Sequence, residues 1–475
     1  MLPVRRSERL EVGDRLVPRA RQQFDPGCPE APPTVAPGPA GQHADQILVE
    51  VGAPLGRDRR KEATVEVIYP RCCGLDVHKQ SVTACLLVPG DGARPRKEVR
   101  TFGTVTDEVL RLGDWLAAHG VTHVAMESTG VYWKPLWNLL EDRFELLLVN
   151  AAHVKAVPGR KTDVRDSEWL AELLRHGLLR PSFVPDRPQR ELRELTRYRT
   201  QLVRERAAEV NRVQKTLEGA NIKLANVATD LMGVSGRAIL AQLVAGQTDA
   251  AALAQLARGK LRPKIPELER ALAGRFGPHQ SFLLARQVAH IDFLDAAIAE
   301  LDAAIAERLS PFEAAVRRLE TVPGVGRRTA EVLLAEIGTD MARFPSASHL
   351  ASWAGMCPGN HESAGKRHSG APRRGNAWLR AALIEAAKAA CRTKRSYLGA
   401  QYRRLAPRRG KQKAAVAVGH SILVIAYHLL AEGTTYHDLG RDFFDQRDRQ
   451  AVERRLVHRL EDLGYAVALT PIAAD

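Results

Sequence analysis

The sequence lacks the marks of a secreted, zinc-binding or membrane-spanning protein. Its six cysteines include no C-x-x-C pair, and the adjacent Cys72 and Cys73 fit neither a disulfide framework nor a zinc site. We find no signal peptide and no apolar run long enough to cross a bilayer. These absences predict a reduced, cytoplasmic protein with no membrane partner.

Residues 1–69 lack any hydrophobic periodicity. Pro, Gly and Ala dominate Gly27–Gly41, so we predict a disordered extension here. Met1 is the only methionine before Met126. We therefore expect native translation to begin near Val65–Tyr69, at a codon other than that for methionine, which mass spectrometry of the native N-terminus would test.

Acidic residues are nearly absent from one basic segment, Ser363–Lys413. This segment contains 15 Lys and Arg and a single acid, Glu385, so it carries +14 of the chain's net charge of +15. A surplus this concentrated predicts a polyanionic partner, most simply nucleic acid. The alternative is a solvated basic face without a partner.

From Arg71 onward the chain has the pattern of an α/β domain, which we assign to residues 70–185. We expect strands at 72–77, 81–88, 97–103, 122–127 and 144–149, and helices at 107–118, at 131–141 and from 163 onward. The last strand is almost wholly apolar and is predicted to be a buried central one. Three strands followed by helix, strand, helix, strand and helix is the order of a ribonuclease H-like fold.

The rest of the chain is predicted to be mainly helical. Between Leu192 and Leu217 apolar residues recur at helical spacing, and from Ile291 to Ile305 they alternate spacings of three and four, as in a coiled-coil seam. We therefore divide the remainder into a helical coiled-coil region (186–312), a C-terminal domain (313–435) and a helical tail (436–475).

Two glycines occur in V-P-G-V-G, within Leu319–Ala330, which has the signature of a helix-hairpin-helix motif. Gly324 and Gly326 allow a tight turn, and N–H groups at the start of the next helix can bind a nucleic-acid phosphate. A plain turn between two helices is the alternative.

Four carboxylates stand out because of where they occur. Asp163 and Asp166 are three residues apart at the start of a helical pattern, and Asp76 and Glu127 each end a strand-like run. Acids in a first helical turn are usually partners of the helix dipole. Four together suit a pair of divalent metals, and hard oxygen ligands favour Mg²⁺ or Mn²⁺.

A glycine-flanked serine lies among the cations of the basic segment, within the loop predicted between residues 351 and 379. A hydroxyl in such a place could attack a phosphodiester while the cations neutralise the charge that develops. Ser363 is our candidate and Ser369 the alternative, although serines in loops are most often turn residues. The residues predicted to bind nucleic acid are Lys161, Gly324, Gly326, Lys366, Arg367, Arg373, Arg374, Asn376 and Arg380.

Taken in order, these motifs resemble the DEDD-type transposases of the insertion-sequence 110 family, including its 1111-like branch. The matching runs are G-L-D-V-H-K with Asp76, A-M-E-S-T-G-V-Y-W with Glu127, G-R-K-T-D-V-R-D with Asp163 and Asp166, V-P-G-V-G, F-P-S-A-S-H-L-A-S-W-A-G-M-C-P-G, and S-A-G-K with the G-N-x-x-L-R that follows. The resemblance covers roughly residues 71–435.

The resemblance implies a RuvC-like domain whose four acids work together with a serine of the C-terminal transposase domain. That serine would attack DNA and form a covalent phosphoserine before strand exchange. The family likeness also implies a non-coding bridge RNA that pairs with target and donor DNA. Because coiled-coil helices separate the two halves, we also expect a homo-oligomer, in which the site could be composed across two subunits. Two departures occur: Ser167 stands where the family often has alanine, and Ala364 where glycine usually follows the catalytic serine, which keeps Ser369 open as the nucleophile.

Two other functions remain open from the sequence. A RuvC-like junction nuclease without a covalent step would need Asp76, Glu127, Asp163 and Asp166 but not Ser363. A non-catalytic nucleic-acid-binding protein would keep its function when the aspartates are replaced by asparagine.

Overall fold

A computed structural model describes residues 66–90, 92, 94–128, 130–150, 166–359, 361–363, 366–369 and 375–470, and of residues 361–363 and 367–369 it describes the backbone alone. The chain divides into two units, Met1–Thr64 and Val65–Asp475, and every described residue belongs to the second. Predictions that fall on Asp163, Lys161, Arg373, Arg374 and residues 1–65 of the N-terminal extension lie outside the described residues. For residues 66–69 the prediction of disorder is wrong, because the backbone N–H groups of Ile68 and Tyr69 donate to the carbonyl oxygen of Arg175, both at 3.0 Å.

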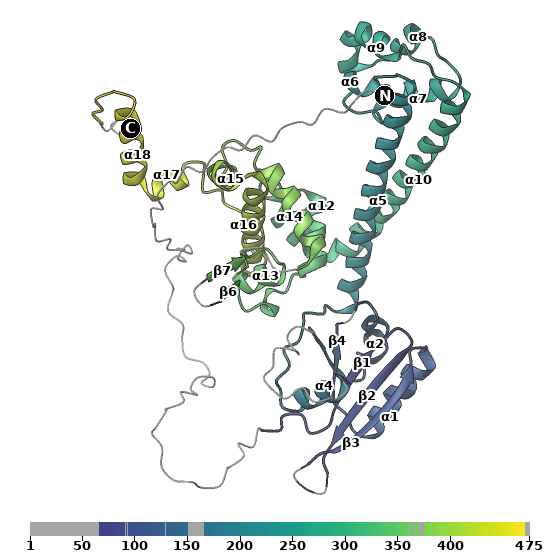
Figure 1. Cartoon of the computed structure of the whole chain (residues 1–475), viewed down its shortest axis with the longest axis vertical. Coiled ribbons are helices and arrows are strands. Elements are labelled where there is room, and N and C mark those ends of the chain that lie inside the picture. Colours follow the sequence, from purple (N-terminus) through teal and green to yellow (C-terminus); the bar gives the residue numbers. More distant parts are fainter. Residues whose placement is uncertain are drawn as a thin grey trace, which may run out of the picture. The chain divides into compact units, whose positions relative to one another are not determined.

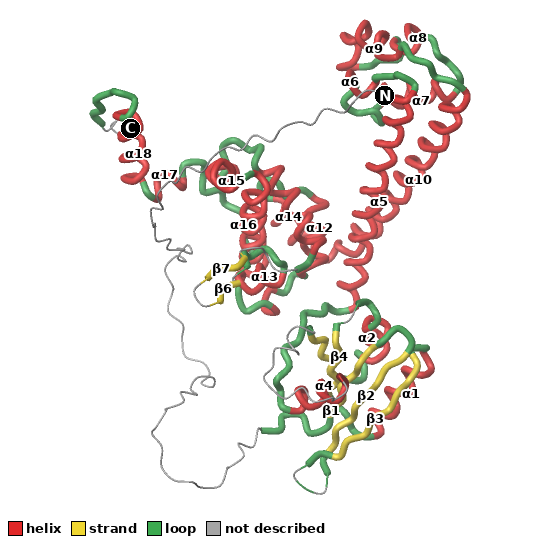
Figure 2. Tube along the Cα trace, in the orientation of Figure 1, coloured by secondary structure: helices red, strands yellow, loops and turns green. Residues whose placement is uncertain are grey.

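Five strands form one mixed sheet in the order β3-β2-β1-β4-β5 (Figures 1 and 2). The strands are β1 (Cys72–Val77), β2 (Ser81–Val88), β3 (Arg96–Gly103), β4 (His123–Glu127) and β5 (Glu145–Val149). Strands β1 to β3 are antiparallel neighbours, whereas β1, β4 and β5 run parallel. The predicted strands and their order along the chain are confirmed, and the sheet is consistent with a ribonuclease H-like fold.

Helices cover both faces of this sheet because its strands alternate between two apolar cores. The helices are α1 (Thr106–Ala118), α2 (Trp133–Leu140) and α4 (Asp166–Arg175). Cys73 and Leu75 of β1 pack in the core formed with α1 and α2. Cys72 packs with Leu170 and Leu174 of α4 on the opposite face. Successive side chains of a strand point to opposite faces, so this alternation fixes which residues lie under α4.

The interpretation of the last strand as a central one is wrong. Strand β5 lies at the edge of the sheet, pairs with β4, and makes one further bridge, from Val149 to Pro181. It is apolar because both of its faces are covered: Leu148 packs in the core on the side of α1 and α2, and Val149 in the core on the side of α4. Burial on both faces, which the sequence indicates, does not require two neighbouring strands.

Two long helices pair antiparallel within one chain. They are α5 (Arg187–Gly219) and α10 (Pro278–Leu309), and a small helical group lies between them in sequence: α6 (Leu224–Val227), α7 (Val234–Val244), α8 (Ala250–Ala254), η1 (Gly259–Lys264) and α9 (Ile265–Leu272). Leu202 of α5 packs on Leu294 and Ile298 of α10. Tyr198, which lies at one of the helically spaced apolar positions between Leu192 and Leu217, is 54% exposed.

Short helices around one central helix make up the C-terminal region. They are η2 (Ser310–Phe312), α11 (Glu313–Glu320), α12 (Arg327–Ile337), η3 (Met341–Arg343), α13 (Ala347–Trp353), α14 (Ala377–Ala390), α15 (Tyr397–Arg409), α16 (Lys411–Glu432), α17 (Phe443–Arg447) and α18 (Arg449–Glu461). By length and composition α16 could cross a membrane, contrary to our reading of the sequence. Its residues Val418, Ile422 and Leu423 are fully buried in the core of this region, which accounts for its apolar character.

Candidate active site

Two of the predicted acids end adjacent parallel strands. Strand β1 pairs with β4 up to Leu75 opposite Met126, and Asp76 and Glu127 are the next residue on each strand. Gly74 of β1 contacts α4, and Ala125 of β4 packs in the core beneath α4. Strand alternation therefore directs the Asp76 and Glu127 side chains to the face that α4 covers.

Gly74 allows α4 to lie directly on β1. A Cβ atom at this position would lie 2.3 Å from the carbonyl oxygen of Ser167 and 2.5 Å from the amide nitrogen of Ala171. Any side chain here would push the helix away from the strand. Since α4 begins at Asp166, this contact brings the third described acid over the same face of the sheet as Asp76.

A histidine that we did not predict binds Asp76. The Nε2 atom of His78 lies 3.1 Å from Oδ2 of Asp76, and the His78 side chain is 64% exposed. His78 lies beyond the end of β1, two residues after the aspartate, in the motif G-L-D-V-H-K. In the sequence, the spacing of two residues between Asp76 and His78 was the only indication of this contact.

The donor atoms of this site suit a hard divalent cation, but the described residues do not complete a metal site. Asp76, Glu127 and Asp166 offer only carboxylate oxygens, which Mg²⁺ and Mn²⁺ prefer. Within the described ranges no group of three or more His, Cys, Asp or Glu side chains could hold a metal ion. Asp163, the fourth predicted ligand, lies outside those ranges.

The predicted serine loop contains a two-stranded hairpin. Strands β6 (His361–Ser363) and β7 (Lys366–Ser369) pair antiparallel, with Ser363 opposite Lys366 beside the turn and Ser369 opposite His361 at the other end (Figure 2). The two candidate serines therefore occupy different ends of the hairpin. Lys366 is exposed, whereas for Arg367 the structure describes the backbone alone.

The chain leaves the hairpin region through two tightly held residues. A Cβ at Gly375 would lie 2.4 Å from the amide nitrogen of Gly355, so the two ends of the excursion meet with their backbones in contact. The next residue, Asn376, caps α14: its side-chain oxygen accepts hydrogen bonds from the backbone N–H groups of Trp378 and Leu379, both at 3.1 Å. Its predicted contact with nucleic acid stays a prediction, as does that of half-buried Arg380.

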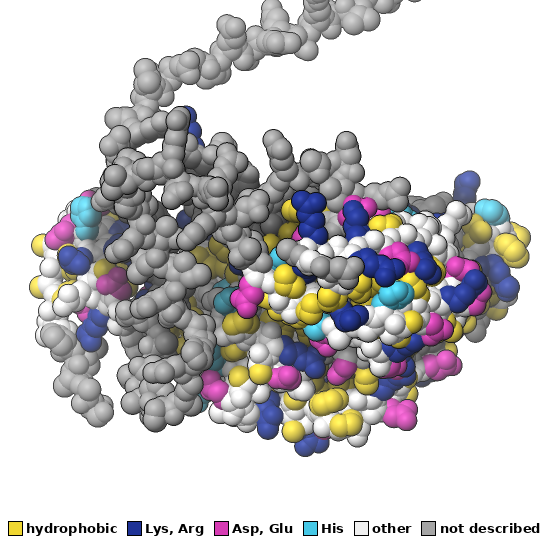
Figure 3. Space-filling view, turned by 90° about the horizontal axis from the view of Figure 1, so that it is seen from below, with side chains coloured by type: hydrophobic (Ala, Val, Ile, Leu, Met, Phe, Trp, Pro, Cys, Tyr) yellow, Lys and Arg dark blue, Asp and Glu magenta, His cyan; other side chains and the backbone are white. Residues whose placement is uncertain are grey.

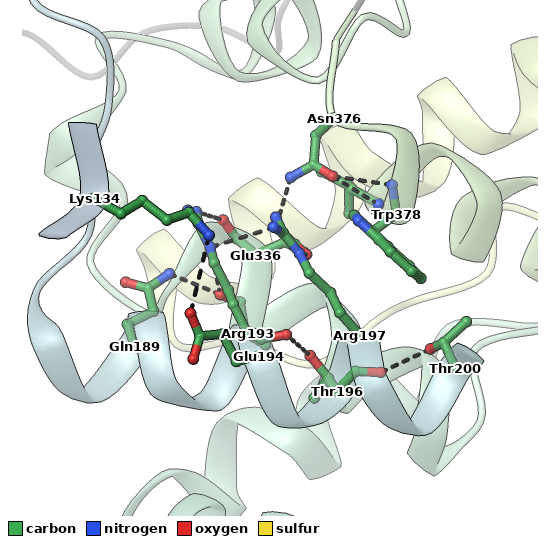
Figure 4. A network of polar contacts seen from close by, with 12 residues as sticks. Lys134, Gln189, Arg193, Glu194, Thr196, Arg197, Thr200, Glu336, Asn376 and Trp378 are labelled. Atoms are coloured by element: carbon green, nitrogen blue, oxygen red, sulfur yellow. Dashed lines mark hydrogen bonds and ion pairs between the residues drawn. The ribbon is translucent and has the colours of Figure 1, made fainter. Parts of the chain in front are cut away.

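The amide of Asn376 also joins a buried charge network, shown in Figure 4. It donates a hydrogen bond of 2.6 Å to Glu336 of α12, whose side chain is fully buried. Arg197 of α5 donates two more, at 2.7 and 2.8 Å, and Arg193 of α5 lies 3.4 Å from the same carboxylate. Burial lowers the pKa of Arg193 to about 10, so it keeps its charge at neutral pH.

A second buried acid of α12, Glu331, binds the same helix α5. Arg199 of α5 donates to Glu331 at 2.5 Å and to Asp302 of α10 at 2.9 Å. Helix α12 is thus held to α5 through two buried carboxylates. None of these pairs was predicted, because charged residues on a helix are ordinarily expected on its solvent face.

Helices α11 and α12 flank the V-P-G-V-G turn of the predicted helix-hairpin-helix motif. The two glycines of this turn differ in their surroundings. Gly324 has φ +88°, and a Cβ there would lie 2.3 Å from the carbonyl oxygen of Ala386 in α14. Gly326, which precedes α12, has open space around it. Gly324 is therefore needed for packing. Only Gly326 leaves the start of α12 open to a phosphate, and the phosphate contact itself stays a prediction.

The positive surplus of the chain is not evident on every face. Figure 3 shows a face on which Lys and Arg side chains are interspersed with Asp and Glu. At the start of α12, directly after the V-P-G-V-G turn, both arginines are internally paired: Arg327 binds Glu313 at 2.7 and 2.8 Å, and Arg328 binds Asp302 at 2.7 Å. The uncompensated charge belongs instead to the basic segment Ser363–Lys413.

Comparison with known protein families matches both the domain of the four acids and the C-terminal region to transposases. A family profile described as "Transposase", that of the DEDD transposases of IS110, matches residues 73–222, and one described as "Transposase IS116/IS110/IS902 family" matches residues 316–403. The first match contains Asp76, Glu127, Asp163 and Asp166, and the second contains the V-P-G-V-G turn and Ser363.

Several bacterial proteins align with most of this region. A probable family 20 transposase of Pseudomonas aeruginosa is 28% identical over 320 residues, which span 66% of this chain and 85% of the relative. The transposase for insertion sequence element IS1111A of Coxiella burnetii is 27% identical over 296 residues, 61% of this chain and 72% of the relative. An insertion element IS110 protein of Streptomyces coelicolor is 26% identical over 299 residues, 59% and 73% of the two chains. The chain belongs to the IS110/IS116/IS902 family of transposases, enzymes that act on DNA.

Proposed function

We propose that this transposase cuts and rejoins DNA with a serine nucleophile of its C-terminal region and the four acids of its N-terminal domain. The acids are Asp76, Glu127, Asp163 and Asp166, and the nucleophile is Ser363. One observation carries the proposal: Asp76 and Glu127 end neighbouring parallel strands on the face that α4, beginning at Asp166, covers. Two carboxylates on neighbouring strands would repel each other without a cation, so the placement of Asp76 and Glu127 favours a bound divalent metal.

In the covalent step, the Ser363 hydroxyl loses its proton and its Oγ atom forms a bond to the DNA phosphorus. The bond from phosphorus to one deoxyribose oxygen breaks, and that oxygen leaves with a proton. A divalent metal bound by the acids would stabilise the charge on the phosphate. The exposed Lys366, opposite Ser363 in the hairpin, is near enough in the chain to hold a non-bridging phosphate oxygen.

We further propose that a bridge RNA selects the DNA and that the active enzyme is a homo-oligomer. The family likeness supports the first part, and the basic segment offers a surface that can hold a nucleic-acid backbone while base pairing reads the sequence. The helical region between the two halves of the site supports the second part. The role of the RNA is tested by measuring recombination with and without RNA transcribed from the DNA that flanks the element. Recombination that is equally efficient without RNA would contradict it, and a monomeric active species in light scattering would contradict the second.

A search for a protein–DNA adduct tests the nucleophile. The purified protein, Mg²⁺, flanking RNA and DNA are incubated, and adducts are resolved on a denaturing gel. Ser363→Ala should lose the adduct and all recombination while nucleic-acid binding remains, and Ser369→Ala should be much milder. The reverse result would make Ser369 the nucleophile. Asp76→Asn should abolish recombination while binding persists, because the basic segment is unchanged.

A junction nuclease without a covalent step is the second candidate. The apolar cores on the two faces of the sheet are built from the N-terminal domain's own residues, so its acids do not need the C-terminal region for their position on the strands. In that case Ser363→Ala would still cut branched DNA at the wild-type rate, and no adduct would form with either serine present.

A further inference from the structure

A basic cavity lies between α15 and the C-terminal tail. Four of its cations belong to the basic segment Ser363–Lys413, in which we expect the run from Arg403 to Lys413 to contact phosphates, and Arg441 and Arg455 of the tail lie outside that segment. The volume of the cavity is about 700 Å³. The lining residues are Lys394, Ala400, Arg403, Arg404, Arg408, Arg441, Asp442, Phe444, Asp445 and Arg455. Six cations and two acids give a formal charge of +4. Lys394, Ala400 and Arg403 lie within the second family profile, which ends at residue 403, and the other seven lining residues lie beyond it.

Specific contacts hold the tail that forms one wall of the cavity. Asp438 accepts hydrogen bonds from the backbone N–H of Tyr397, at 2.9 Å, and of Gly440, at 2.7 Å. The Tyr397 ring packs against Phe443 and Phe444, with centroids 5.2 and 5.1 Å apart. The cavity is therefore a built feature of the fold in which α15 and the tail share a small aromatic and polar core.

Most of the cavity's positive charge has no internal partner. Arg441 pairs with Asp442 at 3.1 Å. In the described part of the chain, none of the other five lining cations has a carboxylate oxygen within 4.0 Å. Arg403 donates to the backbone oxygen of Lys394, which leaves its charge uncompensated. Like charges gathered in one cavity repel, so an anionic ligand would stabilise this arrangement.

Phe444, the one aromatic residue among the described lining residues, already packs against two neighbours. Phe444 stacks on Tyr397 with an angle of 17° between the rings, and the guanidinium of Arg404 lies 5.6 Å from its centroid. A nucleobase would have to displace one of these neighbours in order to stack there. The cavity offers cations to phosphates and no free platform to bases.

We propose that this cavity binds the phosphodiester backbone of nucleic acid and holds it without reading its sequence. The inference deepens the proposed function, because the backbone would belong to the DNA substrate or to the guide RNA. It assigns a role in binding to the tail helices α17 and α18, of which Arg455 on α18 reaches the cavity.

The salt dependence of binding tests the site. Arg408→Gln combined with Arg455→Gln removes two cavity cations that take no part in docking the tail. The slope of log affinity against log salt should become shallower by about 1.8 for duplex DNA, or about 1.4 for a single strand. A four-fold rise in salt would then cost the variant about twelve-fold less affinity for duplex DNA than it costs the wild type.

The matched control combines Arg454→Gln with Arg459→Gln, two exposed arginines of α18 that do not line the cavity. It removes the same charge and should leave the slope at its wild-type value. Measuring DNA and RNA separately shows which backbone occupies the site. Equal slopes in the test variant and the wild type, or the same change in test and control, would overturn the proposal.

Asp438→Ala separates a built cavity from a general charge effect. Removing an acid should tighten binding to a polyanion if only net charge matters. If the cavity matters, release of the tail should weaken binding and make the salt slope shallower, although every cation is kept. Tighter binding would contradict the proposal. The assay for the protein–DNA adduct tests the nucleophile independently of the cavity. If the adduct forms but the salt slope of the cavity variant equals that of the wild type, only the cavity proposal is wrong. If the salt slope changes but no adduct forms, only the proposed nucleophile is wrong.

Discussion

Replacing Glu336 by glutamine tests the buried charge network between α5 and α12. The carboxylate is fully buried and accepts two hydrogen bonds from Arg197 and one from Asn376. Glutamine keeps the shape of the side chain but removes the charge that balances Arg193 and Arg197. Breaking a buried ion pair costs about 3–5 kcal/mol. Because the Arg197 side chain is 31% exposed, water can solvate part of its charge, and we expect about 3 kcal/mol.

Hydrogen exchange measured by mass spectrometry on peptides of α12 and α14 reports this loss for the C-terminal region alone, without assuming that the whole chain unfolds in one step. A loss of about 3 kcal/mol corresponds to exchange roughly 100-fold faster. The control is Glu385→Gln on α14, whose carboxylate is 71% exposed and pairs with Lys388. We expect a change below about 0.5 kcal/mol there. Exchange at the control's rate in Glu336→Gln would refute the assignment of a structural role to this network.

Three further outcomes follow from the described contacts. Gly74→Ala should push α4 off β1 and lower both DNA cleavage and the melting temperature, at a cost of about 1–3 kcal/mol, while salt-dependent DNA binding stays unchanged. Ser167→Ala should raise the free energy of unfolding by about 1 kcal/mol in chemical denaturation, because this hydroxyl is buried and has no hydrogen-bond partner among the described residues. Burial raises the pKa of Cys72 and Cys85 to about 12, so at pH 8 their thiolate fraction is negligible and iodoacetamide should modify half-buried Cys391 before either of them, as peptide mass mapping can show.

The parts of the fold that were predictable are those with a strong local pattern. The β1–β3 order and the strand-end positions of Asp76 and Glu127 follow from short apolar runs and the polar residues that end them. The edge position of β5 does not, because covering by helices on both faces makes an edge strand as apolar as a central one. The serine hairpin was missed because its strands, of three and four residues, are polar and charged.

The buried acids of α12 could not be predicted for a different reason. Glu331 and Glu336 are charged residues within an amphipathic helix, and local patterns place such residues toward water. Their burial depends on Arg193, Arg197 and Arg199, which lie more than 130 residues earlier in the chain. A polar pairing over that separation has no local signature, so it becomes visible only when the two helices are seen together.

Packing and chemistry make separate demands on the glycines of the family motifs. At Gly74, Gly324 and Gly375 a Cβ would lie 2.3–2.4 Å from a backbone atom of another segment, a separation that backbone atoms cannot accommodate. Each of these glycines fixes a segment next to candidate chemistry: the helix that begins at Asp166, the turn before α12, and the base of the serine hairpin. Gly326 meets nothing within 4 Å. The glycines of these motifs therefore combine positions that hold the scaffold together with one, Gly326, that keeps an approach open, and only the latter can be explained by a ligand.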